Sequence, residues 1–181
     1  RHIYVFSIKK LMKSKKNIVL IGMMGSGKTS IGKILSKRLN INFIDIDKKI
    51  EEDESMNISD IFKKYGENYF RKIEEKISLK FLNSENSIIS LGGGGFLNSL
   101  IRKSCKKKCI TFWLNWKNET IIKRILKSKK RPIAFNSNEN DLKQLINERS
   151  NIYGEANFKI NCETLTKNMI VKNIIKLYEK N

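Results

Sequence analysis

A glycine-rich loop between a strand and a helix constrains the fold of this 181-residue chain more than any other feature. The run NIVLI at 17–21 is followed at once by GMMGSGKT at 22–29, which fits the pattern G-x-x-x-x-G-K-[ST]. A helical pattern at 28–39 comes directly after it, so the strand–loop–helix context that this pattern requires is complete. Glycines let the backbone turn its N–H groups toward a phosphate, and the helix adds its positive N-terminal end. The segment predicts a binding loop for a nucleoside triphosphate.

Two side chains of this loop have the chemistry for specific roles. Lys28 can reach the β and γ phosphates, and the Thr29 hydroxyl can ligate Mg²⁺. A chance glycine-rich turn is the alternative, and the flanking strand and helix disfavour it. The loop predicts ATP-type chemistry, but it does not identify the acceptor.

Short apolar runs alternate with helical patterns along the rest of the chain, which is typical of β-α units around a parallel sheet. Strands are expected at 17–21, 42–46, 87–91, 110–114 and 158–161. Helices are expected at 28–39, 58–65, 67–83, 98–106, 119–127, 141–153 and 167–179. We therefore predict an α/β fold with a five-stranded parallel sheet flanked by helices, and a ligand site at the carboxyl ends of the strands.

Residues 12–181 show no internal repeat or long linker, so we expect a single domain there. The polar run SKKRPIAFNSNEN at 128–140 lacks periodicity and holds the one proline, Pro132, which predicts a lid loop at about 127–140. Arg131 in this loop could close over ATP and stabilise the transferring phosphoryl group, although an ordinary charged loop would look similar. Residues 1–11 either belong to the protein or form a non-native or disordered extension, because Met12 offers an alternative start.

Composition limits the partners of the chain. The formal net charge is +19, but the lysines are spread along the whole sequence without interleaved aromatic residues. We therefore expect a solvated basic surface and no nucleic-acid partner. No apolar run approaches the roughly 20 residues of a membrane span, and IYVFS at 3–7 is too short for a signal-peptide core. A cytoplasmic protein without a membrane partner is expected.

The few cysteines and the single histidine argue against disulfide bonds, zinc binding and histidine-based catalysis. Cys105, Cys109 and Cys162 are odd in number and lack paired spacing, so no disulfide framework is expected. The pair Cys105 and Cys109 is weak support for a metal and fits reduced thiols in or near a basic helix. His2 is the single histidine, which argues against histidine-based catalysis and zinc chemistry.

Acidic and apolar residues alternate in FIDID at 43–47. Side chains two apart on a strand share a face, so Asp45 and Asp47 are expected to project together beside the phosphate loop. One could hold Mg²⁺ through water, and the other could accept a hydrogen bond from a substrate hydroxyl. The strand at 87–91 lacks the acidic residue that motor ATPases usually carry there, which favours a small-molecule kinase.

Three other features fit an acceptor site but are ambiguous alone. Arg71 and Glu74 are three residues apart on a helix, so Glu74 can orient the guanidinium toward a carboxylate. An ordinary surface ion pair is the simpler interpretation. The four glycines at 92–95 let the backbone approach a ligand closely, although a flexible turn would look the same. Arg149 lies on the helix after the lid, where a solvated helix face is the alternative.

In order and spacing, these pieces resemble the shikimate kinase family over nearly the whole chain after about Asn17. The shared runs are GMMGSGKTSIG, FIDID, NISDIFKKYGENYFRKIEE, LGGGG, the RP of the lid and ERSNIYGEA. The third run is the most specific, because the family writes it S-I-x-x-I-F-x-x-x-G-E-x-x-F-R-x-x-E. The resemblance implies a monomeric P-loop kinase of the nucleoside-monophosphate-kinase-like fold. Its reaction would transfer the γ-phosphoryl group of ATP to the 3-hydroxyl of shikimate, in the route to chorismate and aromatic amino acids.

The resemblance also implies a role for each candidate residue. The ATP-binding residues would be Gly25, Ser26, Gly27, Lys28, Thr29 and Ser30, with Arg124 near adenine and Arg131 reaching the phosphates from the lid. Thr29 would bind Mg²⁺ directly and Asp45 through water. Shikimate would contact Asp47, Arg71, Gly92, Gly93, Gly94 and Arg149, with the two arginines clamping its carboxylate. Lys28, Asp47 and Arg131 would be catalytic, and Asp47 would act as a base or only position the hydroxyl.

The chain departs from the family pattern at four positions outside these residues. Ser55 stands where the family usually has glycine, and Asn57 replaces a serine. Asn151 stands where the family often has proline, and Gly154 where a larger, often charged residue is usual. Two alternatives stay open. The first is a gluconate-type kinase, which would not need both Arg71 and Arg149. The second is a catalytically silent relative or a basic nucleic-acid binder. It would lack a catalytic residue, whereas this sequence has all of them.

Overall fold

The computed structural model describes residues 16–127 and 138–181. Five strands form one parallel sheet in the order β2-β3-β1-β4-β5. Their bounds are β1 Asn17–Ile21, β2 Asn42–Asp45, β3 Ser87–Ser90, β4 Cys109–Asn115 and β5 Phe158–Asn161. The predicted α/β fold with a five-stranded parallel sheet is confirmed.

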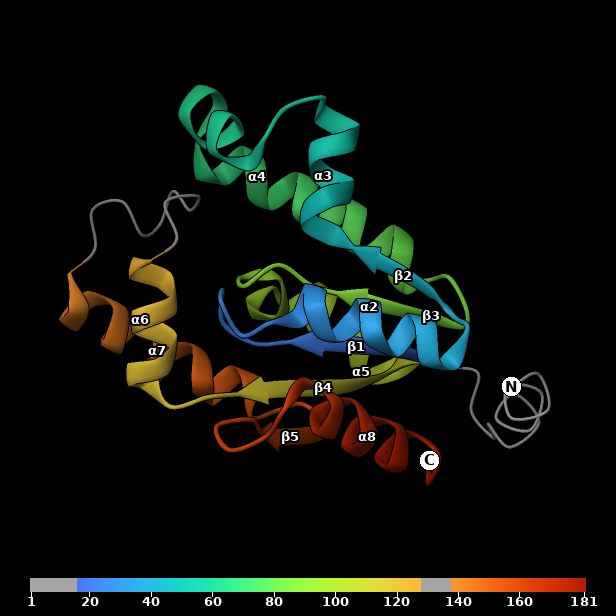
Figure 1. Ribbon diagram of the computed structural model, residues 1–181. Helices are drawn as coiled ribbons and strands as arrows, with labels where there is room; N and C mark the ends of the chain where they lie inside the picture. The colour runs from blue at the N-terminus through green and yellow to red at the C-terminus, as the bar shows by residue number, and fades with distance from the viewer. Residues whose placement is uncertain (1–15, 128–137) are drawn as a thin grey trace.

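Both faces of the sheet are buried, which explains why β1 reads as a nearly continuous apolar run. Ile18 and Leu20 pack on one face under α2 (Lys28–Leu39) and α8 (Lys167–Tyr178). Val19 and Ile21 pack on the other under α4 (Ile58–Leu82), α5 (Ser99–Lys108) and α7 (Glu139–Tyr153). Figure 1 shows the sheet between these two helical layers.

One predicted strand ends early, and the chain turns there into a helix that the sequence analysis missed. Strand β2 ends at Asp45, and α3 spans Ile46–Glu54. Asp45 is the N-cap residue and Asp47 lies in the first turn, where the positive end of the helix dipole favours an acidic side chain. Ile46 and Ile50 are both buried on the inner face of α3. The expectation that Asp45 and Asp47 share a strand face is therefore wrong.

The helices predicted at 58–65 and 67–83 form one long element, α4, with a kink at Gly66 (φ 79°, ψ 174°). Positive φ is a conformation that glycine adopts without the steric cost of a side chain, so Gly66 marks the break. Helix α6 spans Asn118–Leu126, and a short 3₁₀ turn covers Gly95–Leu97. Helix α7 begins at Glu139, two residues earlier than predicted, with Asn138 closing a capping box.

The chain connections leave a crevice where the strands end. From β1 the chain crosses to β2 on one side, whereas from β3 it crosses to β4 on the other. Such a reversal at the carboxyl ends of parallel strands is where ligands bind in open α/β sheets. In Figure 1, α3 and α4 rise beyond β2, and α6 and α7 stand together on the far side of the phosphate loop.

Two expectations from composition concern the described part of the chain. Across residues 16–127 and 138–181, no helix combines the length and apolar character that crossing a membrane needs. Cys105, Cys109 and Cys162 are buried free thiols, the first on α5 and the second at the start of β4.

Candidate active site

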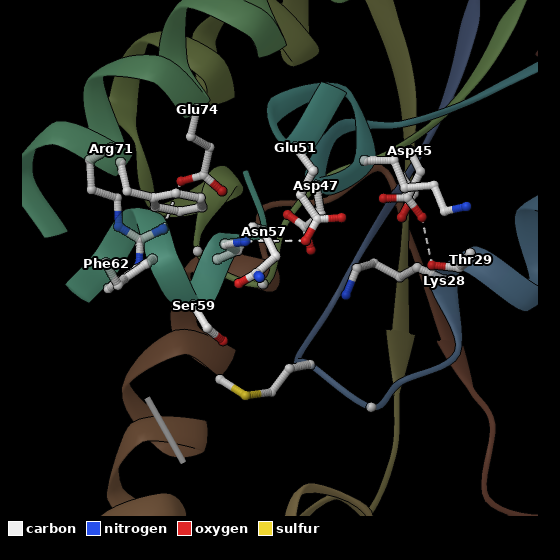
Figure 2. A pocket seen from close by; sticks show the side chains of 18 of the residues that line it. Lys28, Thr29, Asp45, Asp47, Glu51, Asn57, Ser59, Phe62, Arg71 and Glu74 are labelled. Carbon is white, nitrogen blue, oxygen red and sulfur yellow. Dashed lines mark hydrogen bonds and ion pairs between the residues drawn. The ribbon is translucent and has the colours of Figure 1, made fainter. Parts of the chain in front are cut away.

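A cavity of about 1010 Å³ opens at the carboxyl ends of β1, β2 and β3. Figure 2 shows Lys28, Thr29 and Asp45 at one end of it and Arg71 and Glu74 at the other. The predicted site residues that line it are Gly25, Gly27, Lys28, Thr29, Ser30, Asp45, Asp47, Arg71, Gly93, Gly94 and Arg149. Ser26 and Gly92 lie just behind its wall, Arg124 lies against the phosphate loop, and Arg131 lies outside the described residues.

The phosphate loop has the backbone conformation that its glycines allow. Gly25 and Gly27 adopt φ of 81° and 89°, and Gly27 begins α2. The Lys28 side chain is buried and folds back over the loop, where its Nζ donates to the carbonyls of Gly22 at 2.8 Å and Met23 at 3.0 Å. The ammonium is therefore held beside the place where the loop would receive phosphates.

Thr29 and Asp45 form the oxygen-rich end of the cavity. The Thr29 Oγ1 hydroxyl donates to Asp45 Oδ2 at 2.7 Å. Hydroxyl and carboxylate oxygens are the ligands that Mg²⁺ prefers. Within the described residues no cluster of three or more histidine, cysteine or acidic side chains could hold a metal alone. A cation here would have to share phosphate and water oxygens, which is the usual way Mg²⁺ binds with a nucleotide, so the residues present fit that ion.

Asp47 reaches the cavity from the first turn of α3 and faces the glycine loop at 92–95. A Cβ atom on Gly92 would lie 2.7 Å from Asp47 Oδ1, and one on Gly94 would lie 2.9 Å from Arg71 Cζ. Only glycine leaves room for these two side chains. The glycine run therefore lets an acidic side chain and a basic side chain each lie directly against the backbone.

Glu74 holds Arg71 in place from inside the protein. Arg71 Nη1 donates to Glu74 Oε2 at 2.7 Å, and Nη2 and Nε donate to Glu67 Oε1 at 2.9 and 3.1 Å. The side chain of Glu74 is 3% exposed, so this is not the ordinary surface ion pair that the sequence left open. Burial raises the pKa of Glu74, and the nearby Arg71 and Arg149 reverse that only in part. Burial opposes the charge on Arg71, yet Glu74 and Glu67 outweigh it and raise the pKa of Arg71.

Arg149 reaches the same glycine loop from α7. It is 6% exposed, and its Nη1 donates to the Gly93 carbonyl at 3.3 Å. Its Nε has no hydrogen-bond partner among the residues that the structure describes. Buried donors are normally satisfied, so Arg149 is poised for a ligand acceptor. Arg71 and Arg149 thus approach the consecutive residues Gly94 and Gly93.

Comparison with known proteins shows the family of the chain. The family model described as shikimate kinase matches residues 24–179. A shikimate kinase of Sulfurihydrogenibium sp. is 42% identical over 160 residues, which cover 88% of this chain and 96% of the relative. The chain belongs to the shikimate kinase family. It is an ATP-dependent phosphotransferase of aromatic amino acid biosynthesis.

Two further proteins support the family assignment. A shikimate kinase of Thermodesulfovibrio yellowstonii is 40% identical over 166 residues, covering 91% of this chain and 96% of the relative. The solved shikimate kinase of Acinetobacter baumannii in complex with shikimate superposes with a TM-score of 0.90 at 29% identity, covering 96% and 98% of the two chains.

Two departures from the shikimate kinase pattern have a structural explanation. Ser55 ends α3 with φ of 50°, a conformation that explains the usual glycine there. Asn57 caps α4 by accepting from the Asp60 N–H, a role that serine fills equally well.

The sequence analysis missed Tyr153. Its hydroxyl donates to the Gly93 carbonyl and contacts Met23 Sδ at 3.8 Å, so it joins the glycine loop to the phosphate loop. Burial raises its pKa to about 12, so it stays a donor at neutral pH. The spacing could have indicated it, because Tyr153 is one helical turn beyond Arg149 and so shares its face.

The raised pKa of Glu74 predicts how stability depends on pH. A carboxyl whose pKa is raised by folding stabilises the protein below its ordinary pKa of 4.5 and loses this contribution as the pH rises through the folded value. The free energy of unfolding of the unmodified protein, minus that of Glu74→Gln, should therefore fall as the pH rises above 4.5. Urea unfolding at a series of pH values measures it. Glu67→Gln, which removes an exposed partner of the same arginine, is the matched control. A difference that grows with pH would mean that the ion pair outweighs burial.

Proposed function

We propose that the chain transfers the γ-phosphoryl group of ATP to the 3-hydroxyl of shikimate, with Mg²⁺ as cofactor, to give shikimate 3-phosphate. We infer the acceptor mainly from Arg71 and Arg149, which approach adjacent glycines in the same cavity as the phosphate loop. Two guanidinium groups suit one carboxylate, because each offers a planar fork of donors. The shikimate bound to the Acinetobacter relative supports the same acceptor.

The donor half of the cavity would hold ATP by its phosphates. Residues 25–30 would bind the phosphate oxygens, mainly through backbone N–H groups other than that of Ser26, which donates to the Met23 carbonyl. Lys28 would exchange its loop carbonyls for the β and γ phosphates. Thr29 directly, and Asp45 through water, would hold Mg²⁺, which when bound neutralises charge on the phosphates. Arg124 would lie near adenine, and Arg131 would reach the phosphates from the lid.

The acceptor half would fix the shikimate ring. Arg71, oriented by Glu74, and Arg149 would bind the carboxylate, with backbone contacts from Gly92, Gly93 and Gly94. Asp47 would accept the hydrogen bond of the reacting hydroxyl and direct that oxygen at the γ-phosphorus. A strong base is not required when the transition state is loose, so catalysis would rest on positioning and on charge stabilisation by Lys28 and Arg131. One chain supplies every one of these residues, and we propose a monomer.

A coupled ADP-release assay tests the proposal. ADP release with ATP and shikimate should far exceed release with gluconate or nucleoside monophosphates at equal concentrations. It should also disappear when EDTA removes Mg²⁺ and return when Mg²⁺ is added. Faster turnover with gluconate or a nucleoside monophosphate would replace the proposed acceptor.

A further inference from the structure

The outer side of the phosphate loop is held by two side chains from the segment that follows β4. Trp116 Nε1 donates to the Ser26 carbonyl at 3.0 Å, and Arg124 Nη1 donates to the Gly25 carbonyl at 3.2 Å. The Arg124 guanidinium carbon lies 3.8 Å from the centre of the Trp116 ring, close enough for a cation–π contact. The indole thus binds the loop directly and also supports Arg124, which binds it as well.

These two contacts fix the peptide units that a phosphate loop depends on. A trans peptide is planar, so its carbonyl and the next N–H point in opposite directions. With the Ser26 carbonyl bound to Trp116, the Gly27 N–H points to the other side of the loop, and Gly27 lines the cavity. The preceding peptide is fixed at both ends, because its Ser26 N–H donates to the Met23 carbonyl at 3.1 Å.

The loop needs such support because glycines flank Ser26. Gly25 and Gly27 both have positive φ, and glycine passes between backbone conformations at little steric cost. A peptide between two glycines can therefore rotate and turn its N–H away from a phosphate. The Trp116 ring is itself anchored, since it packs against the buried side chains of both faces of the sheet.

We infer that Trp116 is a positioning residue of the phosphate loop, which holds the Gly27 N–H toward the nucleotide through the Ser26 carbonyl and through Arg124. The inference rests on the proposed placement of the ATP phosphates on residues 25–30. Trp116 does not need to touch ATP, and its effect falls on the KM for ATP and not on the KM for shikimate. A ring that stacked directly on the base would also change the KM for ATP, but it would leave the loop unchanged without nucleotide.

Hydrogen exchange without nucleotide and steady-state kinetics test this together. Trp116→Phe removes the indole N–H but keeps an aromatic face for Arg124, and Trp116→Leu removes both. Losing one hydrogen bond should raise the KM for ATP about 3- to 10-fold in Trp116→Phe. Losing the cation–π support as well should raise it about 10- to 100-fold in Trp116→Leu. Exchange should accelerate within residues 23–29 of the free protein, and the KM for shikimate should stay within about twofold, because the clamp arginines lie across the cavity.

Phe81→Leu is the matched control. Like the Trp116 variants, it removes an aromatic ring that faces a cation, here the Lys80 ammonium at 5.7 Å from the ring centre. Phe81 lies near the end of α4, at the end of the sheet away from the cavity. The substitution should change neither KM nor exchange in the loop. If Trp116→Leu does not fold, Trp116→Phe decides alone.

Three results would overturn the inference. They are an unchanged KM for ATP with unchanged loop exchange, a raised KM for ATP with unchanged loop exchange, and acceleration of exchange along the whole chain. A lack of ATP-dependent turnover in the unmodified protein would instead refute the proposed function, whereas exchange in the loop would still test the role of Trp116.

Discussion

Replacing Lys28 by Ala is expected to lower kcat by about 10³-fold or more without unfolding the protein, because phosphoryl transfer relies on charge stabilisation. Lys28 is the one charged side chain of the loop at 22–29, and its ammonium is held within reach of any phosphate bound there. Alanine leaves the backbone N–H groups in place, so ATP should still bind, although with lower affinity. The measurement is kcat with saturating shikimate and ATP, alongside circular dichroism and thermal unfolding.

Lys33→Ala provides the control for this experiment. Lys33 is exposed on the same helix, so its replacement removes an equal charge without touching the loop. Its kcat should match that of the unmodified protein. A folded Lys28→Ala protein that keeps its turnover would remove the phosphate loop from the mechanism and, with it, the proposed kinase reaction.

The phosphate loop could be predicted from the sequence because its constraints are local. Its glycines, Lys28 and Thr29 lie within eight consecutive residues, and the flanking strand and helix each show their own pattern. The observed bounds of β1 and α2 agree with the predicted 17–21 and 28–39. Local sequence and tertiary structure favour the same conformation here, so no competing term displaces the prediction.

Helix α3 could not be predicted in the same way, because its pattern fits two structures. In IDIDKKIEE the first residues alternate as on a strand, whereas Ile46 and Ile50 also have helical spacing. Packing decides between them, since both isoleucines are fully buried against the core. Asp47 was predicted to reach the site from a strand, but it reaches the cavity from a helix. Asp45 and Asp47 nevertheless both line the cavity.

Contacts between distant segments account for what the sequence did not predict around the cavity. The spacing of Arg71 and Glu74 predicted their contact, but not that Glu74 is buried beneath the glycine loop around Gly92. The bond from Trp116 to Ser26 joins residues 90 positions apart, and no local pattern indicates it. The first contact depends on how α4 lies against the glycine loop, and the second on how the segment after β4 lies against the phosphate loop; only the fold determines both.

Replacing Arg71 by Lys should selectively weaken the use of shikimate. Arg71 bonds Glu74 and Glu67 through three different nitrogens, which fixes the plane of the guanidinium beside Gly94. Lysine keeps the charge but has one nitrogen, so it cannot hold both glutamates and also present a fork to a carboxylate. We expect kcat/KM for shikimate to fall about 10- to 1000-fold, equivalent to about 1.4–4 kcal/mol of transition-state stabilisation.

The effect should be specific to the acceptor, because Arg71 lies at the opposite end of the cavity from Lys28 and Thr29 (Figure 2). The KM for ATP should change little, and Arg149→Lys should behave in the same way because Arg149 approaches the adjacent glycine. Arg38→Lys is the control, since the Arg38 guanidinium donates to Asn168 Oδ1 on the exposed surface of α2. Steady-state kinetics with both substrates varied separates the outcomes. An unchanged kcat/KM for shikimate, or equal losses for ATP and shikimate, would mean that the two arginines do not clamp the acceptor, and the carboxylate would have to bind elsewhere in the cavity.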